Sequence, residues 1–358
     1  MIFNRTSFNM KAKKMGAGVL CALLLCGCGV DSAKSSKNIE MKSTSFFAMD
    51  TVMDIQIAGD EELLNEAQQM VADLESKLSV TSENSEIGKI NKDKIGRLSP
   101  ESATIFKGAM EICESTEGAL DISIYPVLKE WGFTTGEYHV PDEETIEKLL
   151  SQVGYDMVRW QDGADDTVDV VLLDDMEIDL GSVVKGYTGT ALSDFFKENG
   201  VDSALINLGG NVQCIGTKQD GTPWKIAVKS PFPNSDSGII GVLEAEDIAV
   251  VTSGGYERYF EEDNQIYWHI LDPKTGSPAK NGLVSVTIVG KDGLMCDGLS
   301  TALFVKGRDD AIDYWKSHKG FDVILVTEDG EVTITEGIKD SFSLSPEYAN
   351  STLTVITR

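Results

Sequence analysis

Asp297 and Thr301 are the residue pair whose types and spacing best suit chemistry. They lie four positions apart in a segment that we predict to be helical over residues 297–305, so both side chains lie on one face of the helix. A carboxylate and a hydroxyl are the hard oxygen ligands that Mg²⁺ prefers. The alternative is that Asp297 caps the start of this helix. The spacing alone leaves both interpretations open.

A second segment, residues 178–187, has the pattern of an anion site. We predict a strand that ends at Asp179, a tight turn at Gly181 and a helix whose first N–H groups are free to bind an anion. Lys185 follows within this helix, where its ammonium group reaches a phosphate. The alternative is a solvated lysine on an ordinary helix surface.

His269 is one of only three histidines, and it ends a predicted strand. A histidine in such a place serves as a general base at neutral pH, and the alternative is a structural histidine bonded to the backbone. Ser253 and Arg258 follow the end of another predicted strand, in a segment with two glycines. They suit a phosphate or a ribose, and the alternative is a glycine-rich turn.

Residues 118–121 form a fifth segment, in which a glycine and a small residue precede Leu120 and Asp121. Because Gly118 and Ala119 are small, the backbone here can approach a ligand closely. Asp121 can accept a hydrogen bond from a hydroxyl or an amine. The alternative is a turn in which Asp121 bonds its own backbone. Together the five segments offer two anion sites, an oxygen pair for a hard cation and one base, which suits chemistry on a diphosphate.

The elements that must position these residues are predicted from apolar spacing and from capping residues. Helices and strands mix without a regular strand–helix–strand order, so we predict an α+β, layered fold rather than a doubly wound sheet. Helices are expected over residues 61–78, 100–113, 142–150, 183–199, 297–305 and 308–318. Strands are expected over residues 46–57, 168–173, 177–180, 204–208, 224–228, 248–252, 267–271, 284–289, 321–327, 331–335 and 352–357.

The N-terminal sequence indicates that the protein is exported. Basic residues precede an apolar run of about 11 residues, too short to span a bilayer and right for a signal peptide. The run ends in a segment that resembles a lipobox, with Cys28 as the acceptor of the lipid. The alternative is a secretory signal with incidental cysteines. We therefore predict a signal peptide over residues 1–28, a polar tether over residues 29–42 and a folded domain over residues 43–358, anchored by lipid on the extracytoplasmic face of the cell membrane.

The composition excludes several classes of protein. The chain has 31 Lys and Arg against 58 Asp and Glu, a formal charge of −27, and so acidic a surface repels nucleic acid and anionic lipid headgroups. Three cysteines remain outside the signal, Cys113, Cys214 and Cys296, with no spacing typical of a disulfide framework or a zinc site.

Taken in order, the segments resemble the ApbE family of FAD:protein FMN transferases. Eight stretches carry the resemblance: MDTVM at 49–53, SEIGKIN at 85–91, GALDISIYPVLKEWGF at 118–133, IDLGSVVKGY at 178–187, LINLGGNV at 205–212, VTSGGYERYF at 251–260, HILDPKTGSP at 269–278 and DGLSTALFVKG at 297–307. They cover nearly all of the predicted folded chain.

The resemblance implies a fold and an activity. The fold would be a single catalytic unit with two subdomains packed around a FAD site. The enzyme would transfer FMN from FAD to a Thr or Ser hydroxyl of an exported acceptor flavoprotein of an electron-transfer system, with Mg²⁺, and release AMP.

The resemblance also implies residue roles. Lys185 and His269 would be catalytic, with His269 the base. Mg²⁺ would be held by Asp297, Thr301 and the backbone carbonyl of Ser182. The FAD site would be lined by Met49, Ala119, Leu120, Asp121, Asp179, Lys185 and the backbone around Leu271.

Two positions depart from the family pattern. Thr81 stands where the family often has an aromatic residue, and Thr190 stands where it often has Asp. The missing ring mildly favours one alternative, a metal-dependent FAD pyrophosphatase that uses water as the nucleophile. Further alternatives are a flavin-binding lipoprotein without catalysis and an inert surface or scaffold lipoprotein.

Overall fold

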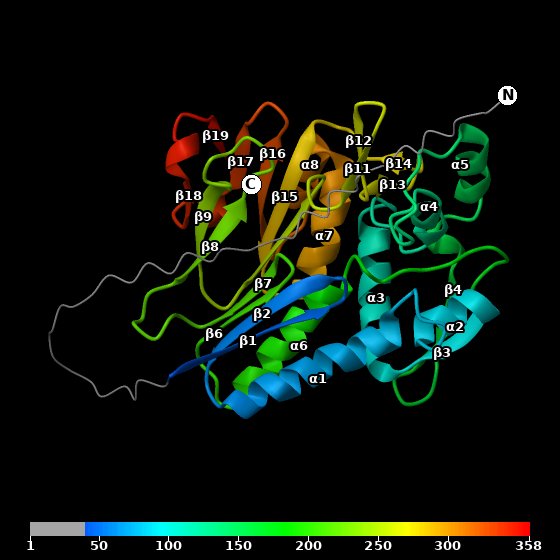
Figure 1. Cartoon of the computed structure of the whole chain (residues 1–358), viewed down its shortest axis with the longest axis horizontal. Coiled ribbons are helices and arrows are strands. Elements are labelled where there is room, and N and C mark those ends of the chain that lie inside the picture. Colours follow the sequence, from blue (N-terminus) through cyan, green and yellow to red (C-terminus); the bar gives the residue numbers. More distant parts are fainter. Residues whose placement is uncertain (1–39) are drawn as a thin grey trace, which may run out of the picture. The chain divides into compact units, whose positions relative to one another are not determined.

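The computed structural model describes residues 40–358, and its main feature is a nine-stranded sheet (Figure 1). All neighbouring strands are antiparallel except the last pair, which is parallel. The order is β1 (Met41–Ala48), β2 (Thr51–Ala58), β6 (Ala204–Leu208), β7 (Asn211–Ile215), β10 (Ala249–Gly254), β15 (Leu283–Gly290), β16 (Phe321–Thr327), β17 (Val332–Thr335) and β19 (Leu353–Ile356).

Both faces of this sheet are covered. Helices α1 (Glu61–Leu78), α6 (Val184–Glu198), α7 (Gly293–Lys306) and α8 (Arg308–Ser317) pack on one face. A small sheet of β8 (Trp224–Lys229), β9 (Ile239–Ala245) and β18 (Phe342–Leu344) shares an apolar cluster with the other face. In β15, Ile288 belongs to the cluster on the helical side and Val289 to the cluster on the opposite side. Because both faces are buried, this strand is apolar almost throughout instead of alternating.

A second subdomain packs against the helical side. It contains α2 (Glu86–Asp93), β3 (Ile95–Leu98), α3 (Pro100–Ser115), α4 (Tyr125–Glu130), α5 (Glu143–Leu150), β4 (Arg159–Asp162) and β5 (Val168–Val171). Two short hairpins follow β10, namely β11 (Tyr259–Glu262) with β12 (Gln265–Trp268), and β13 (Leu271–Asp272) with β14 (Ser277–Pro278). One apolar cluster runs from Phe106 of α3 to Phe304 of α7 and Ile288 of β15, so the two subdomains share a core.

The predicted α+β class is confirmed, and α1 and β6 have the predicted bounds. Three strand predictions were wrong. Residues 46–57 form a hairpin, β1 and β2, because Met49 and Asp50 have positive φ and turn the chain. The strand over 267–271 is interrupted, because β12 ends at Trp268 and β13 begins at Leu271.

Residues 177–180 are extended, but they are not a strand. The backbone N–H and C=O of Ile178 bond the side-chain amide of Asn91, both at 2.8 Å, and the N–H of Asp179 donates to the carbonyl of Ile122 at 2.8 Å. A side chain and a loop therefore replace the neighbouring strand that the prediction required.

The predicted signal peptide, Cys28 and most of the tether lie outside the described residues. The described chain starts its first strand at Met41, within the predicted tether. Among residues 40–358, no helix is long and apolar enough to cross a membrane.

Candidate active site

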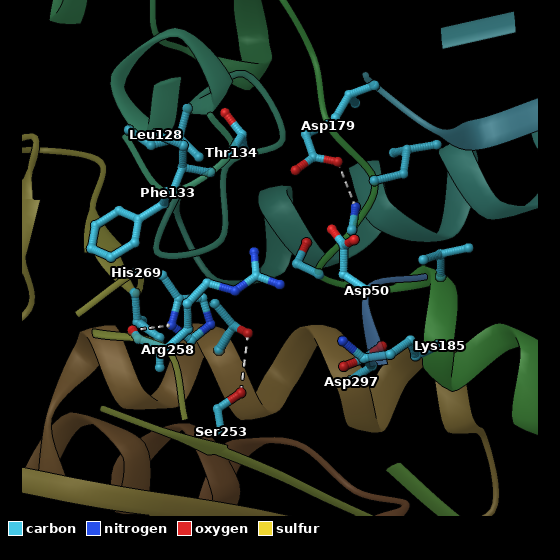
Figure 2. Close-up of a pocket in the computed structure, with 18 of the residues that line it drawn as sticks. Asp50, Leu128, Phe133, Thr134, Asp179, Lys185, Ser253, Arg258, His269 and Asp297 are labelled. Carbon is cyan, nitrogen blue, oxygen red and sulfur yellow. Dashed lines mark hydrogen bonds between the residues drawn. The ribbon is translucent and has the colours of Figure 1, made fainter. Parts of the chain in front are cut away.

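A cavity of about 320 Å³ lies between the two subdomains, and both line it. The structure brings to its wall every residue predicted from the sequence as catalytic, FAD-binding or metal-binding: Met49, Ala119, Leu120, Asp121, Asp179, Ser182, Lys185, His269, Leu271, Asp297 and Thr301. Figure 2 shows Lys185 and Asp297 together on one side of the cavity, and Arg258 and His269 together on the other.

The first side is built by the contact between α6 and α7. Gly186 makes this contact possible, because a Cβ at this position would lie 2.0 Å from the carbonyl oxygen of Gly293. With the helices this close, the N–H of Gly186 donates to Oδ2 of Asp297 at 2.8 Å. Lys185, the residue before Gly186, points its charge at the same carboxylate.

Asp297 is not the cap of its helix. Helix α7 begins four residues earlier, at Gly293, and the side chain of Asp292 caps it by accepting the N–H of Met295 at 3.1 Å. Asp297 is only 7% exposed. Burial raises the pKa of its carboxyl group, and the charge of Lys185 and the hydrogen bond from Gly186 oppose that rise. The structure thus removes the capping alternative and leaves a buried carboxylate on a cavity wall.

Thr301 lies one helical turn beyond Asp297 and also lines the cavity. Its hydroxyl is 3.3 Å from that of Ser253 on β10, which in turn is 2.7 Å from that of Ser300. Among residues 40–358, no group of three or more His, Cys, Asp or Glu side chains is arranged to hold a metal. The oxygens of Asp297, Thr301 and Ser182 fit a hard cation that keeps most of its water, as Mg²⁺ does.

The second side of the cavity is organised by the backbone of Arg258. Its carbonyl oxygen accepts from the backbone N–H of His269 at 3.1 Å and lies 3.2 Å from Nδ1 of the same residue. A carbonyl can only accept, so Nδ1 carries the hydrogen and Nε2 keeps a free lone pair. Burial and the charges of Arg258 and Lys185 lower the pKa of His269 to about 3. The imidazole is therefore neutral at physiological pH.

The guanidinium of Arg258 extends toward the middle of the cavity in Figure 2. Asp179 lies across the cavity, where its Oδ1 accepts the N–H of Gly181 at 2.8 Å. Burial raises the pKa of Asp179, and the charges of Arg258 and Lys185 counteract this. The side chains of Arg258 and Lys185 thus bring positive charge to the cavity from opposite sides. This arrangement suits the binding of a diphosphate.

Asp121 makes the local turn bonds that the sequence offered as the alternative. Its Oδ1 accepts from the N–H and the hydroxyl of Ser123, at 2.8 and 2.6 Å, and its Oδ2 accepts the N–H of Tyr155 at 2.9 Å. Burial raises the pKa of this carboxyl group, and these hydrogen bonds oppose the rise. The carboxylate holds the loop that presents Ala119 and Leu120 to the cavity.

Sequence reasoning missed several lining residues, among them Asp50, Glu75, Phe133, Asn211 and Glu257. Asp50 lies in the MDTVM stretch, but the β1–β2 turn that brings it to the cavity has no Asn-Gly or Asp-Gly signal, although both of its turn residues are left-handed. The N–H of Met49 in this turn donates to Oε1 of Glu75 on α1 at 2.9 Å, which fixes the turn at the cavity. Phe133 could have been found, since it closes one of the stretches that carry the resemblance.

The comparisons agree with this geometry. The model of the ApbE family matches residues 49–325, which is most of the chain. The chain belongs to the ApbE family. Among relatives of this ApbE protein, a FAD:protein FMN transferase of Klebsiella pneumoniae is 32% identical over 294 residues, covering 79% of this chain and 88% of that one. A FAD:protein FMN transferase of Vibrio cholerae is 29% identical over 295 residues, covering 80% and 86%.

Solved structures show the same relationship. The crystal structure of the ApbE protein of Thermotoga maritima superposes with a TM-score of 0.77 and 32% identity, covering 84% of this chain and 99% of that one. The flavin transferase ApbE of Vibrio cholerae gives a TM-score of 0.72 and 25% identity, with the same coverage.

The two departures from the family pattern lie in different places. Thr81 lines the cavity, and its hydroxyl is 3.1 Å from that of Ser79. The hydroxyl of Thr190 accepts the N–H of Gly293 at 3.0 Å. Thr190 therefore stabilises the contact between α6 and α7. Of the two departures, Thr81 is the one that lies where a ligand in the cavity would contact it.

Proposed function

We propose that this ApbE-family protein is a Mg²⁺-dependent FAD:protein FMN transferase that attaches FMN to a Thr or Ser hydroxyl of an exported acceptor protein. The observation that carries the proposal is the set of groups that line this one cavity: two cations, a hard-oxygen pair and a neutral imidazole with a free Nε2. The names of the relatives point to the same reaction.

The chemistry follows from these side chains. The acceptor hydroxyl attacks the phosphorus on the FMN side of the diphosphate, so a phosphoester bond forms while the bond between the two phosphates breaks. The hydroxyl proton goes to Nε2 of His269. Lys185 and Arg258 hold the diphosphate and neutralise its charge as AMP departs. The low pKa of His269 rises once the anionic substrate offsets the two cations that depress it.

Asp297, Thr301 and the carbonyl of Ser182 would hold the metal, which supplies polarisation of the diphosphate and stabilises charge on the leaving oxygen. The fit rests on the buried carboxylate of Asp297, whose Oδ2 is bonded to Gly186 and whose side chain faces the cavity. Burial raises the pKa of that carboxyl group, and the nearby charge of Lys185 opposes this rise and so favours the ionised form that a metal would bind.

A FAD pyrophosphatase is the second candidate, because Thr81 brings a small hydroxyl to the cavity wall instead of a ring. A stacking ring retains a flavin and excludes water from the diphosphate. With the ring absent, water reaches the same phosphorus, and the products are free FMN and AMP.

We also propose a cellular location for the protein. The signal-like N-terminus and Cys28 support lipid anchoring on the extracytoplasmic face of the membrane, where an exported acceptor is met. Labelled palmitate incorporation that is lost in Cys28→Ala would support the anchor, and unchanged incorporation in that variant would refute the assignment of Cys28.

One assay tests the reaction. Residues 29–358 are mixed with FAD, Mg²⁺ and the envelope and secreted proteins of the producing cell, and protein-bound flavin fluorescence, acceptor mass and AMP are followed. We expect one acceptor to gain the mass of one FMN, and EDTA to prevent this. FMN and AMP released without acceptor modification would establish the pyrophosphatase instead. Bound FAD without turnover would refute both.

A further inference from the structure

Strand β7 turns two buried amides toward the helical side of the sheet. Side chains alternate along a strand, so Val212 and Cys214 face the small sheet, while Asn211, Gln213 and Ile215 face the helices. Ile215 belongs to the apolar cluster on that side. The two amides are as deeply buried, with Asn211 6% exposed and Gln213 5% exposed. Two polar side chains therefore occupy positions where a buried strand normally has apolar ones.

Neither amide is fully paired. Nδ2 of Asn211 and Oε1 of Gln213 are buried and form no well-aligned hydrogen bond within residues 40–358. Each atom has lost its hydrogen bonds to water without replacing them, which lowers the stability of the fold. An apolar side chain of similar size would avoid this cost, so folding alone does not explain why these positions are polar.

The two amides differ in what lies beside them. Asn211 lines the cavity and Gln213 does not. Asn211 directly follows the turn at Gly209 and Gly210, and this turn packs so closely on the β1–β2 hairpin that a Cβ at Gly209 would collide with the side chain of Thr51. Gln213 lies beside α6, where a Cβ at Gly189 would be 3.5 Å from the Cβ of Gln213. Only the unpaired Nδ2 of Asn211 is therefore placed to act in the cavity.

The group beside this amide is the carboxylate of Asp297, on the side of the cavity that Figure 2 shows with Lys185. As a nearby donor, Asn211 helps to hold down the pKa of the Asp297 carboxyl group against the effect of burial. The N–H of Gly186 already donates to Oδ2 of this carboxylate at 2.8 Å. Because a carboxylate has about four acceptor positions on its two oxygens, it can accept a second donor and still bind a metal.

We propose that Asn211 is a positioning residue of the metal site, whose amide donates to Asp297 when a divalent cation binds and fixes the orientation of the carboxylate. The inference rests on the proposed Mg²⁺ site of Asp297, Thr301 and Ser182. Carboxylates that ligate a metal are themselves held by hydrogen bonds, and loss of such a bond typically weakens metal binding about 10–100-fold. Gly186 supplies one of these bonds from the backbone, and Asn211 supplies the other from a side chain, so the unpaired Nδ2 gains its partner as the site fills.

The test compares Asn211→Leu with Gln213→Leu. Both changes remove an incompletely paired amide from the same buried face of β7, and only the first removes it from the cavity. Wild-type and variant proteins of residues 29–358 are saturated with FAD, and the binding of Mn²⁺ is followed through the EPR signal of the free ion, with FAD alone as the reference. The Kd for FAD without metal and the melting temperature without ligands are measured in parallel.

We expect Asn211→Leu to raise the Kd for Mn²⁺ by about tenfold or more, and Gln213→Leu to change it less than about twofold. The Kd for FAD without metal should be unchanged in both variants. The melting temperature of the metal-free protein should not fall in Asn211→Leu, because the buried Nδ2 has no well-aligned hydrogen bond to lose. A purely structural residue would show the reverse, a lower melting temperature with unchanged metal binding.

A Kd for Mn²⁺ in Asn211→Leu equal to that of the wild type would overturn the proposal. So would a melting temperature that falls in Asn211→Leu and not in Gln213→Leu, because the amide would then stabilise the fold itself. A raised Kd for FAD without metal would also overturn it, since the amide would then contact FAD directly. Failure of the proposed metal site has a different signature, because the wild-type protein would then bind no Mn²⁺ beyond what FAD alone binds.

Discussion

The two sides of the cavity are built in different ways. Lys185 and Asp297 lie on helices that touch through Gly186 and are buried against the central sheet. Arg258 and His269 lie at the base of a two-stranded hairpin whose far end is solvent-exposed. The helical side has the rigid support that a metal and a diphosphate need. The hairpin side belongs to a part with few buried contacts, and such parts adapt to a partner more easily.

The strongest test of the helical side is Asp297→Asn, which keeps the size of the side chain and removes its charge. Because the charge is buried on the cavity wall, we expect turnover to fall by about 10²–10³-fold. FAD binding in the absence of Mg²⁺ should persist. Full Mg²⁺-dependent turnover in this variant would remove the metal assignment.

The matching test of the hairpin side is His269→Gln. The amide preserves a polar group but cannot take the proton of the hydroxyl, so we expect kcat for transfer to fall by about 10²-fold or more. FAD affinity should change little, as fluorescence titration would reveal. An unchanged kcat in His269→Gln would show that a group other than His269 takes the proton of the acceptor hydroxyl.

Gly186→Ala tests whether the helical side is as tightly built as the distances indicate. The added Cβ would meet the backbone of Gly293 at 2.0 Å, so α6 and α7 must separate, and we expect a loss of about 1–3 kcal/mol in the free energy of unfolding. Gly189→Ala on the same helix is the control, because its nearest neighbour would be the Cβ of Gln213 at 3.5 Å. Equal melting temperatures for the two variants would show that the helices adjust freely.

The last test concerns acid stability on the hairpin side. The folded-state pKa of His269, about 3, lies below its ordinary value of 6.5. The unfolded chain therefore binds a proton first as pH falls, and the neutral histidine costs stability progressively from about pH 6.5 down to about pH 3. The melting temperature should fall less between pH 7 and pH 4 for His269→Gln than for the wild-type protein. An equal fall in melting temperature for the two proteins would show that groups other than His269 cause the acid sensitivity.

The sequence was most informative where chemistry and local pattern coincide. The apolar spacing of α1 predicted its bounds, and seven of the eight resembling stretches contribute residues to one cavity. It was least informative where tertiary contacts override the local pattern. Residues 177–180 look like a strand, but Asn91, far away in the sequence, takes their hydrogen bonds. Asp297 also looked like a cap, and the start of α7 four residues earlier, where Asp292 is the cap, decided against it.

The unbroken core also limits how substrates are exchanged. Phe106, Phe304 and Ile288 belong to one apolar cluster that runs beneath the cavity from one subdomain into the other. Swinging the subdomains apart about a hinge would expose this cluster to water, at a cost far above thermal energy. In the proposed reaction, FAD would therefore enter and AMP would leave by local motion around the cavity, without separation of the two subdomains.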